Sequence, residues 1–280
     1  VGTEQYQFLT DVFRFRGDFA YPISAKGYLQ FLDEDWDVCC TPSYPVGGMS
    51  EFIKRMEQRA VQAGVRIYKS QPVLEITGGR ARGGRYVITT PNYTATANRL
   101  VIGVDAAGFK YIGGNIAEQI KAQPQFQDLL PVKVAVVTQF WPNSWWDSAI
   151  PGKTLSRAWT TEHCLNFIEI PSDDYGKALK VTRSVYDDDM RCVEFWETTA
   201  KRGVSAVEEE IKRGLQYLFP AATIPNPLKT DVQIWPAAWY FLKAGSPFSN
   251  EDIGVWALNP IPNEFVSMVG ESYNPQRSTW

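Results

Sequence analysis

The stretch Val46–Ile76, VGGMSEFIKRMEQRAVQAGVRIYKSQPVLEI, combines a glycine pair, a helical pattern and two strand-like patterns. Its apolar residues recur at close to 3.6-residue spacing and predict an amphipathic helix. The apolar face of that helix contains Phe52, Ile53, Met56, Ala60 and Ala63. Ser50 is a candidate N-cap. Gly64 stands where a helix commonly ends in a left-handed residue, so both ends of the helix can be assigned.

Strands are predicted to follow this helix, because Val65 and Ile67 alternate with polar residues and PVLEI resumes the apolar pattern after the break at Pro72. Gly47 and Gly48 precede the helix. A glycine pair allows the backbone to approach a ligand closely, and it also serves a plain strand-to-helix turn. The stretch alone therefore leaves both interpretations open.

The remaining sequence predicts further strands and helices. GGRARGG is typical of a hairpin tip, and RYVITTPNYTATANRLVIGV predicts two more strands with a turn near Pro91–Asn92. NIAEQIKAQ has helical spacing, and VKVAVVTQFW predicts a buried strand. In SAVEEEIKRGLQYLF, Ser205 and Glu208 fit a capping box. The inward residues of that helix are Val207, Ile211, Leu215 and Leu218. Strands in runs rather than strict βαβ alternation indicate an α+β fold.

Composition excludes several classes of protein. The chain has 280 residues, is 44% hydrophobic and 21% charged, and carries a net charge of −3, as expected for an ordinary soluble globular protein without nucleic acid as its main partner. No apolar run approaches the length that spans a membrane. Ten tryptophans favour either an aromatic-walled cavity or bulky core packing.

Metal and thiol chemistry are also disfavoured. Cys39 and Cys40 are adjacent, Cys164 and Cys192 stand alone in the sequence, and no CxxC spacing argues for zinc. The single histidine, His163, excludes a multi-histidine metal site and leaves a Cys–His nucleophile pair as a minor alternative. The acidic turns SDDYG and YDDDM lack the spacing of a calcium-binding loop, so we expect them to be solvated.

Five segments occur in an order that resembles the flavin-containing amine oxidases, in particular their L-amino-acid oxidase branch. The helix and strands after VGGM come first, followed by ATANRLVIGVDAAGF, LLPVKVAVVTQFWPNSWW, WPAAWYFLKAGSP and VSMVGESYNPQRSTW. The resemblance implies an α+β fold in which a mixed β-sheet substrate domain with flanking helices adjoins strands that complete an FAD-binding domain. It implies FAD as the cofactor and no metal.

The same resemblance assigns the cofactor-binding residues. Gly47, Gly48 and Met49 would lie close to the cofactor, and Val73 would offer main-chain hydrogen bonds to the adenine, unless it is only a strand residue. Gly270 would permit close contact, and Glu271 would accept hydrogen bonds from ribityl hydroxyls or lie by the pyrophosphate, unless it is only a surface acid. Trp280 would lie near the flavin.

Two residues are assigned to the chemistry. Lys133 lies in an apolar run, where an unpartnered ammonium is costly to bury. The resemblance implies that it holds a water at the flavin N5, whereas a lysine reaching solvent is the structural alternative. Trp239 would form an aromatic wall of the substrate cavity, or belong to the core. Strand alternation sends Tyr240 to the opposite face.

The sequence lacks one motif of the family that it resembles, and this absence indicates what partner to expect. No G-x-G-x-x-G motif lies between a strand and a helix. We therefore expect this chain to be the downstream part of a nicked or heteromeric, oligomeric enzyme, or a partial sequence of one. Another polypeptide would carry the dinucleotide-binding motif. The expected ranges are residues 1–45 as a lead-in, 46–110 associated with the FAD domain, 111–235 as the substrate domain and 236–280 as the return to the flavin.

The implied reaction is oxidation of an L-amino acid. Hydride leaves the α-carbon for flavin N5, the imino acid hydrolyses to a keto acid and ammonia, and oxygen reoxidises the flavin to give hydrogen peroxide. A polyamine or monoamine oxidase, or a non-catalytic binding protein with the same fold, is the alternative. The sequence does not identify the substrate side chain or the cellular compartment.

Overall fold

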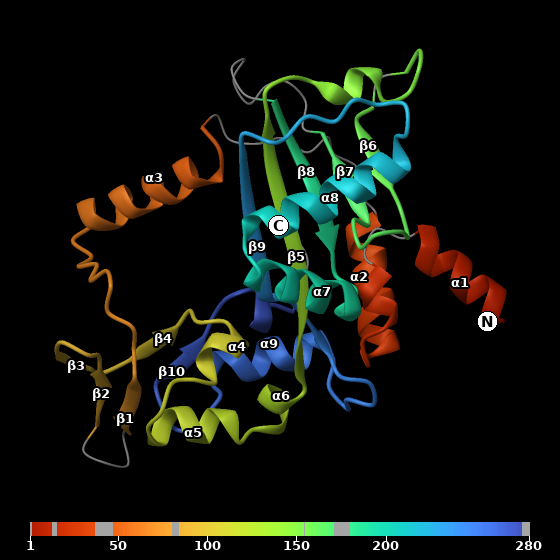
Figure 1. The fold of residues 1–280 in the computed structure, drawn as a ribbon. Helices are drawn as coiled ribbons and strands as arrows, with labels where there is room; N and C mark the ends of the chain where they lie inside the picture. Colours follow the sequence, from red (N-terminus) through yellow and green to blue (C-terminus); the bar gives the residue numbers. More distant parts are fainter. Residues whose placement is uncertain are drawn as a thin grey trace. The chain divides into compact units, whose positions relative to one another are not determined.

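The computed structural model describes residues 2–12, 16–36, 47–79, 84–153, 155–170 and 180–275. The chain forms two compact units, each assembled from two separate segments (Figure 1). The first unit joins the segment that ends at Ile23 to Leu130–Ala244, and the second joins Ser24–Leu129 to the segment that begins at Gly245. The ranges expected from the sequence are consecutive, whereas the two units interleave along the chain.

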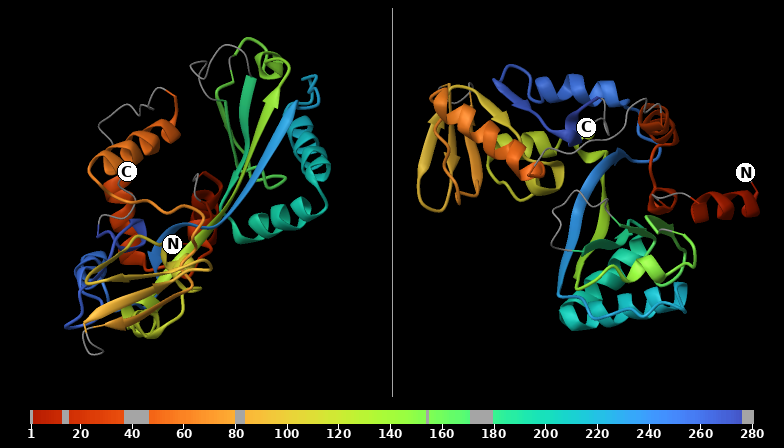
Figure 2. Two further views of the ribbon diagram at one scale, coloured as in Figure 1. Left: turned by 90° about the vertical axis from the view of Figure 1, so that its left-hand side faces the viewer. Right: turned by 90° about the horizontal axis from the view of Figure 1, so that it is seen from above.

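A five-stranded sheet organises the first unit. Its strands, in spatial order, are β6 (Arg157–Trp159), β7 (Phe167–Glu169), β8 (Lys180–Asp187), β5 (Leu129–Trp141) and β9 (Lys229–Leu242). Neighbouring pairs β6–β7, β7–β8 and β8–β5 are antiparallel. Helices α7 (Met190–Lys201) and α8 (Val204–Leu218) cover one face of this sheet (Figure 2). The strand β5 confirms the buried run predicted from VKVAVVTQFW.

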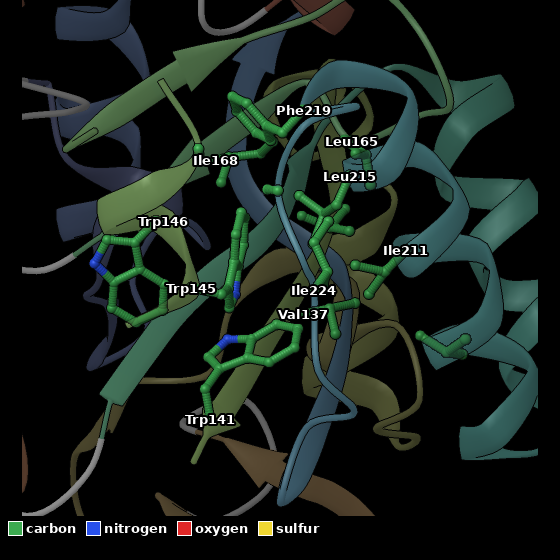
Figure 3. Packing of buried hydrophobic residues seen from close by; sticks show 14 of the residues in the cluster. Val137, Trp141, Trp145, Trp146, Leu165, Ile168, Ile211, Leu215, Phe219 and Ile224 are labelled. Carbon is green, nitrogen blue, oxygen red and sulfur yellow. The ribbon is translucent and has the colours of Figure 1, made fainter. Parts of the chain in front are cut away.

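The core of this unit lies between the sheet and the two helices, as Figure 3 shows. Trp141 and Trp145 stack edge to face, with ring centroids 5.7 Å apart, and the short helix η3 (Trp145–Ser148) supplies the second ring. The predicted inward residues of α8, Val207, Ile211 and Leu215, are fully buried, while Leu218 is partly buried. Much of the high tryptophan content is therefore used in core packing.

The second unit contains two small sheets. Strands β1 (Glu75–Gly79), β2 (Arg85–Thr89) and β3 (Thr94–Ala97) form an antiparallel sheet, which confirms the hairpin around the predicted tip, although residues 80–83 lie outside the described part. Strands β4 (Leu100–Ile102) and β10 (Val266–Met268) pair in parallel. The helices of this unit are α2 (Ala25–Trp36), α3 (Met49–Gln62), α4 (Ala106–Phe109), α5 (Asn115–Lys121), α6 (Pro124–Gln127) and α9 (Asn250–Leu258).

Tyr86 joins the antiparallel sheet to the segment that leads into β10. Its fully buried phenol donates to Glu264 Oε2 at 2.7 Å and accepts from the backbone N–H of Phe265 at 2.7 Å. Helix α5 packs against β1, and the Asn115 side chain exchanges hydrogen bonds with the backbone of Gly78. The contacts of Tyr86 hold the segment that leads into β10 against the antiparallel sheet.

Helix α3 confirms the helix predicted in the opening stretch, but none of its residues is buried. Gly64 has a φ of 86°, as its position predicts. Gly48 rather than Ser50 is the N-cap, because the helix begins at Met49 and Ser50 is already helical. The residues from Val65 to Lys69 form no strand, since none of the described strands pairs with them. Both of these predictions are therefore wrong.

The capping box predicted at Ser205 and Glu208 is also wrong. Helix α8 begins at Val204 with Gly203 as its N-cap, and the Glu208 carboxylate accepts from Thr230 Oγ1 on β9 at 2.7 Å. A capping box does form at α9, between Ser249 and Asp252. Among the residues that the structure describes, no helix combines the length and apolar character required to cross a membrane.

The N-terminal segment of the first unit contains α1 (Thr3–Val12) and the short helix η1 (Arg16–Phe19). A single β-bridge between Ile23 and Lys243, together with a hydrogen bond from Ala244 N–H to the Pro22 carbonyl at 2.7 Å, joins this segment to the end of β9. The N-terminal segment is thus bonded directly to a strand of the sheet.

Candidate functional site

Two groups of residues carry the chemistry that the sequence analysis assigned, one in each unit. In the second unit, β10 is followed by Val269 and Gly270 and then by the short helix η5 (Glu271–Tyr273). Gly270 has a φ of 126°, which side-chain-bearing residues rarely adopt. Among the described residues, no atom beyond its chain neighbours lies within 4 Å of the position that a Cβ would occupy. A ligand can therefore approach this backbone closely.

The carboxyl ends of the two parallel strands are held together beside this glycine. Ser272 Oγ lies 3.4 Å from the backbone N–H of Ala106, and Tyr273 Oη donates to the Val104 carbonyl at 3.1 Å. Both partners follow β4, so the strand ends are fixed at one edge. In open α/β sheets, ligands bind at the carboxyl ends of the strands.

A largely apolar cleft of about 820 Å³ opens at the same place. It is lined by residues of α9, by the end of β10 and by the η5 segment, including Val255, Leu258, Met268, Gly270 and Glu271. The Glu271 carboxylate can accept hydrogen bonds from ligand hydroxyls. An exposed backbone turn, a carboxylate and an apolar wall fit one edge of a nucleotide cofactor such as FAD.

The other predicted cofactor residues that the structure describes do not line this cleft. Met49 is the first residue of α3, and Gly47 and Gly48, which precede it, have positive φ angles of 88° and 81°. Val73 lies in the extended segment before β1, not within that strand. Trp280 lies outside the described residues. Within the described part of the chain, no atom beyond its chain neighbours lies within 4 Å of a Cβ position on Gly48, as at Gly270.

In the first unit, the two predicted catalytic residues both contact the segment that contains η1. The backbone N–H of Lys133 donates to Tyr21 Oη at 3.1 Å. Its ammonium lies 3.4 Å from Glu197 Oε1 and is about half exposed, because α7 brings that carboxylate to β5. The Trp239 side chain lies close enough to Asp18 to lower the pKa of that carboxyl group. Lys133 and Trp239 are thus connected through residues 18–21.

Asp18 is a buried carboxyl group that the sequence does not predict. It is 2% exposed, and no hydrogen bond of ordinary geometry reaches either of its oxygens among the described residues. Burial raises the pKa of Asp18 to about 7, although the Trp239 side chain acts in the opposite direction. The group therefore changes charge near neutral pH.

The acidic turn YDDDM, expected to be solvated, is buried at the end of β8. Asp187 and Asp188 are fully buried, and Asp189 is the N-cap of α7. This prediction is wrong because the N-terminal segment folds over the turn. Arg16 forms a salt bridge with Asp187 at 2.7 Å, and Gly17 N–H donates to Asp188 Oδ1 at 3.0 Å.

Electrostatics within this group follow from burial. Burial raises the pKa of Asp187 to about 6, with the charge of Arg16 acting against it. The pKa of Asp188 is also raised, first by burial and then by the nearby charge of Asp18. Burial raises the pKa of Tyr21 as well. The cluster consequently disfavours additional negative charge.

Cys164 and Cys192 are not isolated thiols, because they form a disulfide with their Cα atoms 5.2 Å apart. The cysteine spacing gave no signal for this bond. It removes both sulfurs from any Cys–His nucleophile pair with His163, whose ring instead packs edge to face on Tyr217. The SDDYG turn lies outside the described residues.

Comparisons with known proteins agree with the fold. Residues 6–267 match the family of flavin containing amine oxidoreductases. No curated protein matches the chain. The crystal structure titled "Putative protoporphyrinogen oxidase from Exiguobacterium sp. 255-15" matches with a TM-score of 0.61 and 13% identity, over 89% of this chain and 54% of that chain. This chain thus spans about half the length of that protein. At this identity, the likeness shows the fold, and it confirms the α+β prediction.

Proposed function

Because this chain belongs to the flavin-containing amine oxidoreductase family, whose cofactor is a flavin and in general FAD, we propose that it forms part of an FAD-dependent L-amino-acid oxidase. The proposed substrates are an L-amino acid and oxygen, and the products are a keto acid, ammonia and hydrogen peroxide. The order of the five sequence segments supports this branch of the family.

The observation that carries the proposal is the turn at Gly270 and Glu271 beside the cleft at the carboxyl end of β10. Gly270 would let the cofactor approach the backbone, and Glu271 would accept hydrogen bonds from its hydroxyl groups. The apolar wall from α9 would exclude water along one side. The bound flavin would supply the two-electron oxidation of the substrate.

Residues of the first unit would shape and polarise the substrate site. Trp239 would provide an aromatic surface for the substrate, and Asp18 would hold its ring in place. Lys133 would hold a water molecule through its ammonium group. The contact of its backbone with Tyr21 supports a fixed position for this stretch of β5.

A second polypeptide carrying the dinucleotide-binding motif is the proposed partner within an oligomeric enzyme, since the 280 residues contain no G-x-G-x-x-G. The exposed apolar face of α3 supports this part of the proposal. Phe52, Ile53 and Met56 on that helix are each more than half exposed. A helix with a sustained apolar face ordinarily buries it.

The proposal is tested by isolating the protein from its natural source and recording its absorption spectrum. We expect a flavin spectrum that is bleached anaerobically by L-amino acids and restored by air with release of peroxide. Bleaching by polyamines or monoamines alone, or by a porphyrinogen, would replace the proposed substrate class. A colourless preparation that does not take up added FAD would instead support the non-catalytic alternative.

Mass spectrometry of the same preparation tests the partner. We expect a second polypeptide that contains G-x-G-x-x-G. Stoichiometric FAD bound to this chain in the absence of any such sequence would contradict the proposal of a partner, while leaving the proposed reaction intact.

A further inference from the structure

The disulfide between Cys164 and Cys192 connects two segments with different environments. Cys164 lies in the connection between β6 and β7 and is partly exposed, whereas Cys192 lies in the first turn of α7 and is 8% exposed. A thiol arriving from solvent therefore reaches the sulfur of Cys164 more readily. Exchange is governed by which sulfur is accessible and by which thiolate leaves more easily.

One cationic group, the Arg16 guanidinium, lies beside the sulfur of Cys192 and favours Cys192 as the leaving group. Arg16 Nη2 lies 3.4 Å from Cys192 Sγ. The residue is also in the N-terminal turn of α7, a twelve-residue helix whose unpaired N–H groups favour negative charge. Asp187 opposes this effect, but its carboxylate is paired with the same guanidinium at 2.7 Å.

Arg16 connects all the segments involved. Besides Asp187 and Cys192, its guanidinium lies 3.5 Å from the carbonyl oxygen of Thr161, in the connection that carries Cys164. Its side chain is only 11% exposed. The charge that would stabilise a Cys192 thiolate is therefore already in place in the oxidised protein.

The connection between β6 and β7 is held in a strained conformation. His163, Cys164 and Asn166 have φ angles of 57°, 54° and 50°, in the left-handed region that residues other than glycine rarely occupy. Besides the disulfide, the Trp196 indole donates to the Cys164 carbonyl at 2.7 Å, and the Asn166 side chain donates to the Tyr186 carbonyl at 3.1 Å. Breaking the disulfide removes the covalent restraint on this strain.

We propose that the Cys164–Cys192 bond is a redox-responsive modification site that exchanges with small thiols in the folded protein, with Cys164 as the attacked sulfur and Cys192 as the leaving thiolate. A small dithiol, in its thiolate form, attacks Cys164 Sγ and breaks the bond to Cys192 Sγ. Its second thiol then displaces the Cys164 thiolate and forms a cyclic disulfide. Two electrons pass from the dithiol to the protein, and the protons of the dithiol go to Cys164 and to solvent.

Reduction would change the local structure in a defined way. Arg16 would share its charge between the Cys192 thiolate and Asp187, while the connection that contains Cys164 could leave the left-handed region. The core behind it would stay intact, because Leu165 and Trp196 are fully buried. The proposal concerns this bond alone and does not depend on the proposed oxidase activity.

Trapping with the monothiol glutathione tests the direction of exchange. The intact protein is incubated anaerobically with glutathione under native conditions, quenched with acid, alkylated and analysed by peptide mass spectrometry. We expect glutathione on Cys164 and an alkylated thiol on Cys192. Glutathione on Cys192, or no exchange while a urea-unfolded sample reacts fully, would overturn the proposal.

Variants at Arg16 test the role of the positive charge. Reduction by dithiothreitol should be slower by about threefold or more in Arg16→Gln, and close to wild type in Arg16→Lys, because a better-stabilised thiolate leaves faster. Arg202→Gln, at the exposed C-terminal end of α7, is the control and should not change the rate. An unchanged rate in a folded Arg16→Gln protein would refute the role of Arg16. If that variant does not fold, the glutathione experiment on the wild-type protein decides the question.

Discussion

Asp18 and Asp188 bring two carboxyl groups together inside the first unit, and the charge on one raises the pKa of the other. Both are almost completely buried, and Asp188 Oδ2, like both oxygens of Asp18, has no hydrogen-bond partner among the described residues. Two adjacent buried carboxyl groups cannot both ionise without a large cost. The pair therefore retains a proton at pH values where an exposed aspartate has lost it.

Stability should consequently fall as pH rises. The pKa of Asp18 is raised to about 7 by burial, so the native state holds a proton that the unfolded chain has already released above its ordinary pKa near 4. This contribution is present at low pH and is lost as pH rises through about 7. Asp187, whose pKa burial raises to about 6, contributes with the same sign.

The first prediction concerns Asp18→Asn. Urea unfolding of the wild-type protein should show a free energy of unfolding that decreases between pH 5 and pH 8, with about 2 to 3 kcal/mol due to Asp18. The variant should lose most of that dependence, because an amide does not titrate. Asp231→Asn, at an exposed position of β9, is the control. Parallel pH curves for wild type and Asp18→Asn would show that Asp18 ionises normally.

The second prediction concerns the turn after β10. Gly270→Ala should weaken FAD binding by about tenfold or more, because the substitution strains a φ of 126° and places a methyl group where the cofactor is proposed to approach. Gly245→Ala is a matched control, since Gly245 also has a positive φ and open space around it. FAD fluorescence titration measures both affinities. Equal effects of the two substitutions would indicate strain alone.

The third prediction concerns Lys133. In the flavin-loaded enzyme, Lys133→Met should slow reoxidation by oxygen by roughly tenfold or more while changing flavin reduction less, equivalent to about 1.4 kcal/mol per decade. Lys212→Met, on the exposed surface of α8, should change neither rate. Stopped-flow absorbance measures both half-reactions. Unchanged reoxidation would leave Lys133 as the partner of Glu197 only.

The fourth prediction concerns Trp239. Trp239→Ala should raise the Michaelis constant for the amino acid, at a cost of about 1 to 3 kcal/mol if the ring contacts substrate. It should also alter the flavin spectrum. Trp235 lies four residues earlier on β9 and is about half exposed. Trp235→Ala should change the Michaelis constant less, and equal effects would place the substrate elsewhere.

Local patterns account for the elements that the sequence predicts correctly. The apolar spacing of Val207, Ile211 and Leu215 repeats within α8 itself, and Gly64 ends α3 through its own backbone freedom. The order of motifs similarly leads to the flavin family. The apolar spacing, the glycine position and the motif order depend only on residues near one another in the sequence. They can therefore be predicted without a structure.

Features that depend on contacts between residues far apart in the sequence cannot be predicted in this way. YDDDM has the composition of a solvated turn. Its carboxylates are buried because Arg16 forms a salt bridge with Asp187 and Gly17 N–H donates a hydrogen bond to Asp188, and both partners lie far away in the sequence. The Cys164–Cys192 bond likewise joins segments with no spacing signal. The capping box predicted at Ser205 fails because tertiary contact recruits Glu208 to Thr230 instead. Long-range pairing decides each of these cases.

The interleaving of the two units also affects biosynthesis. Arg16 and Gly17 bind Asp187 and Asp188, so the N-terminal segment leaves the ribosome 171 residues ahead of its partners. At translation rates of about 5–20 residues per second, this delay is roughly 10–30 s. During that interval the aromatic segment around Phe19 and Tyr21 has no completed sheet to pack against. Chaperone demand should therefore be greatest between synthesis of the segment around Arg16 and synthesis of β8, and a ribosome-bound fragment ending before β8 should remain protease-sensitive in its first unit.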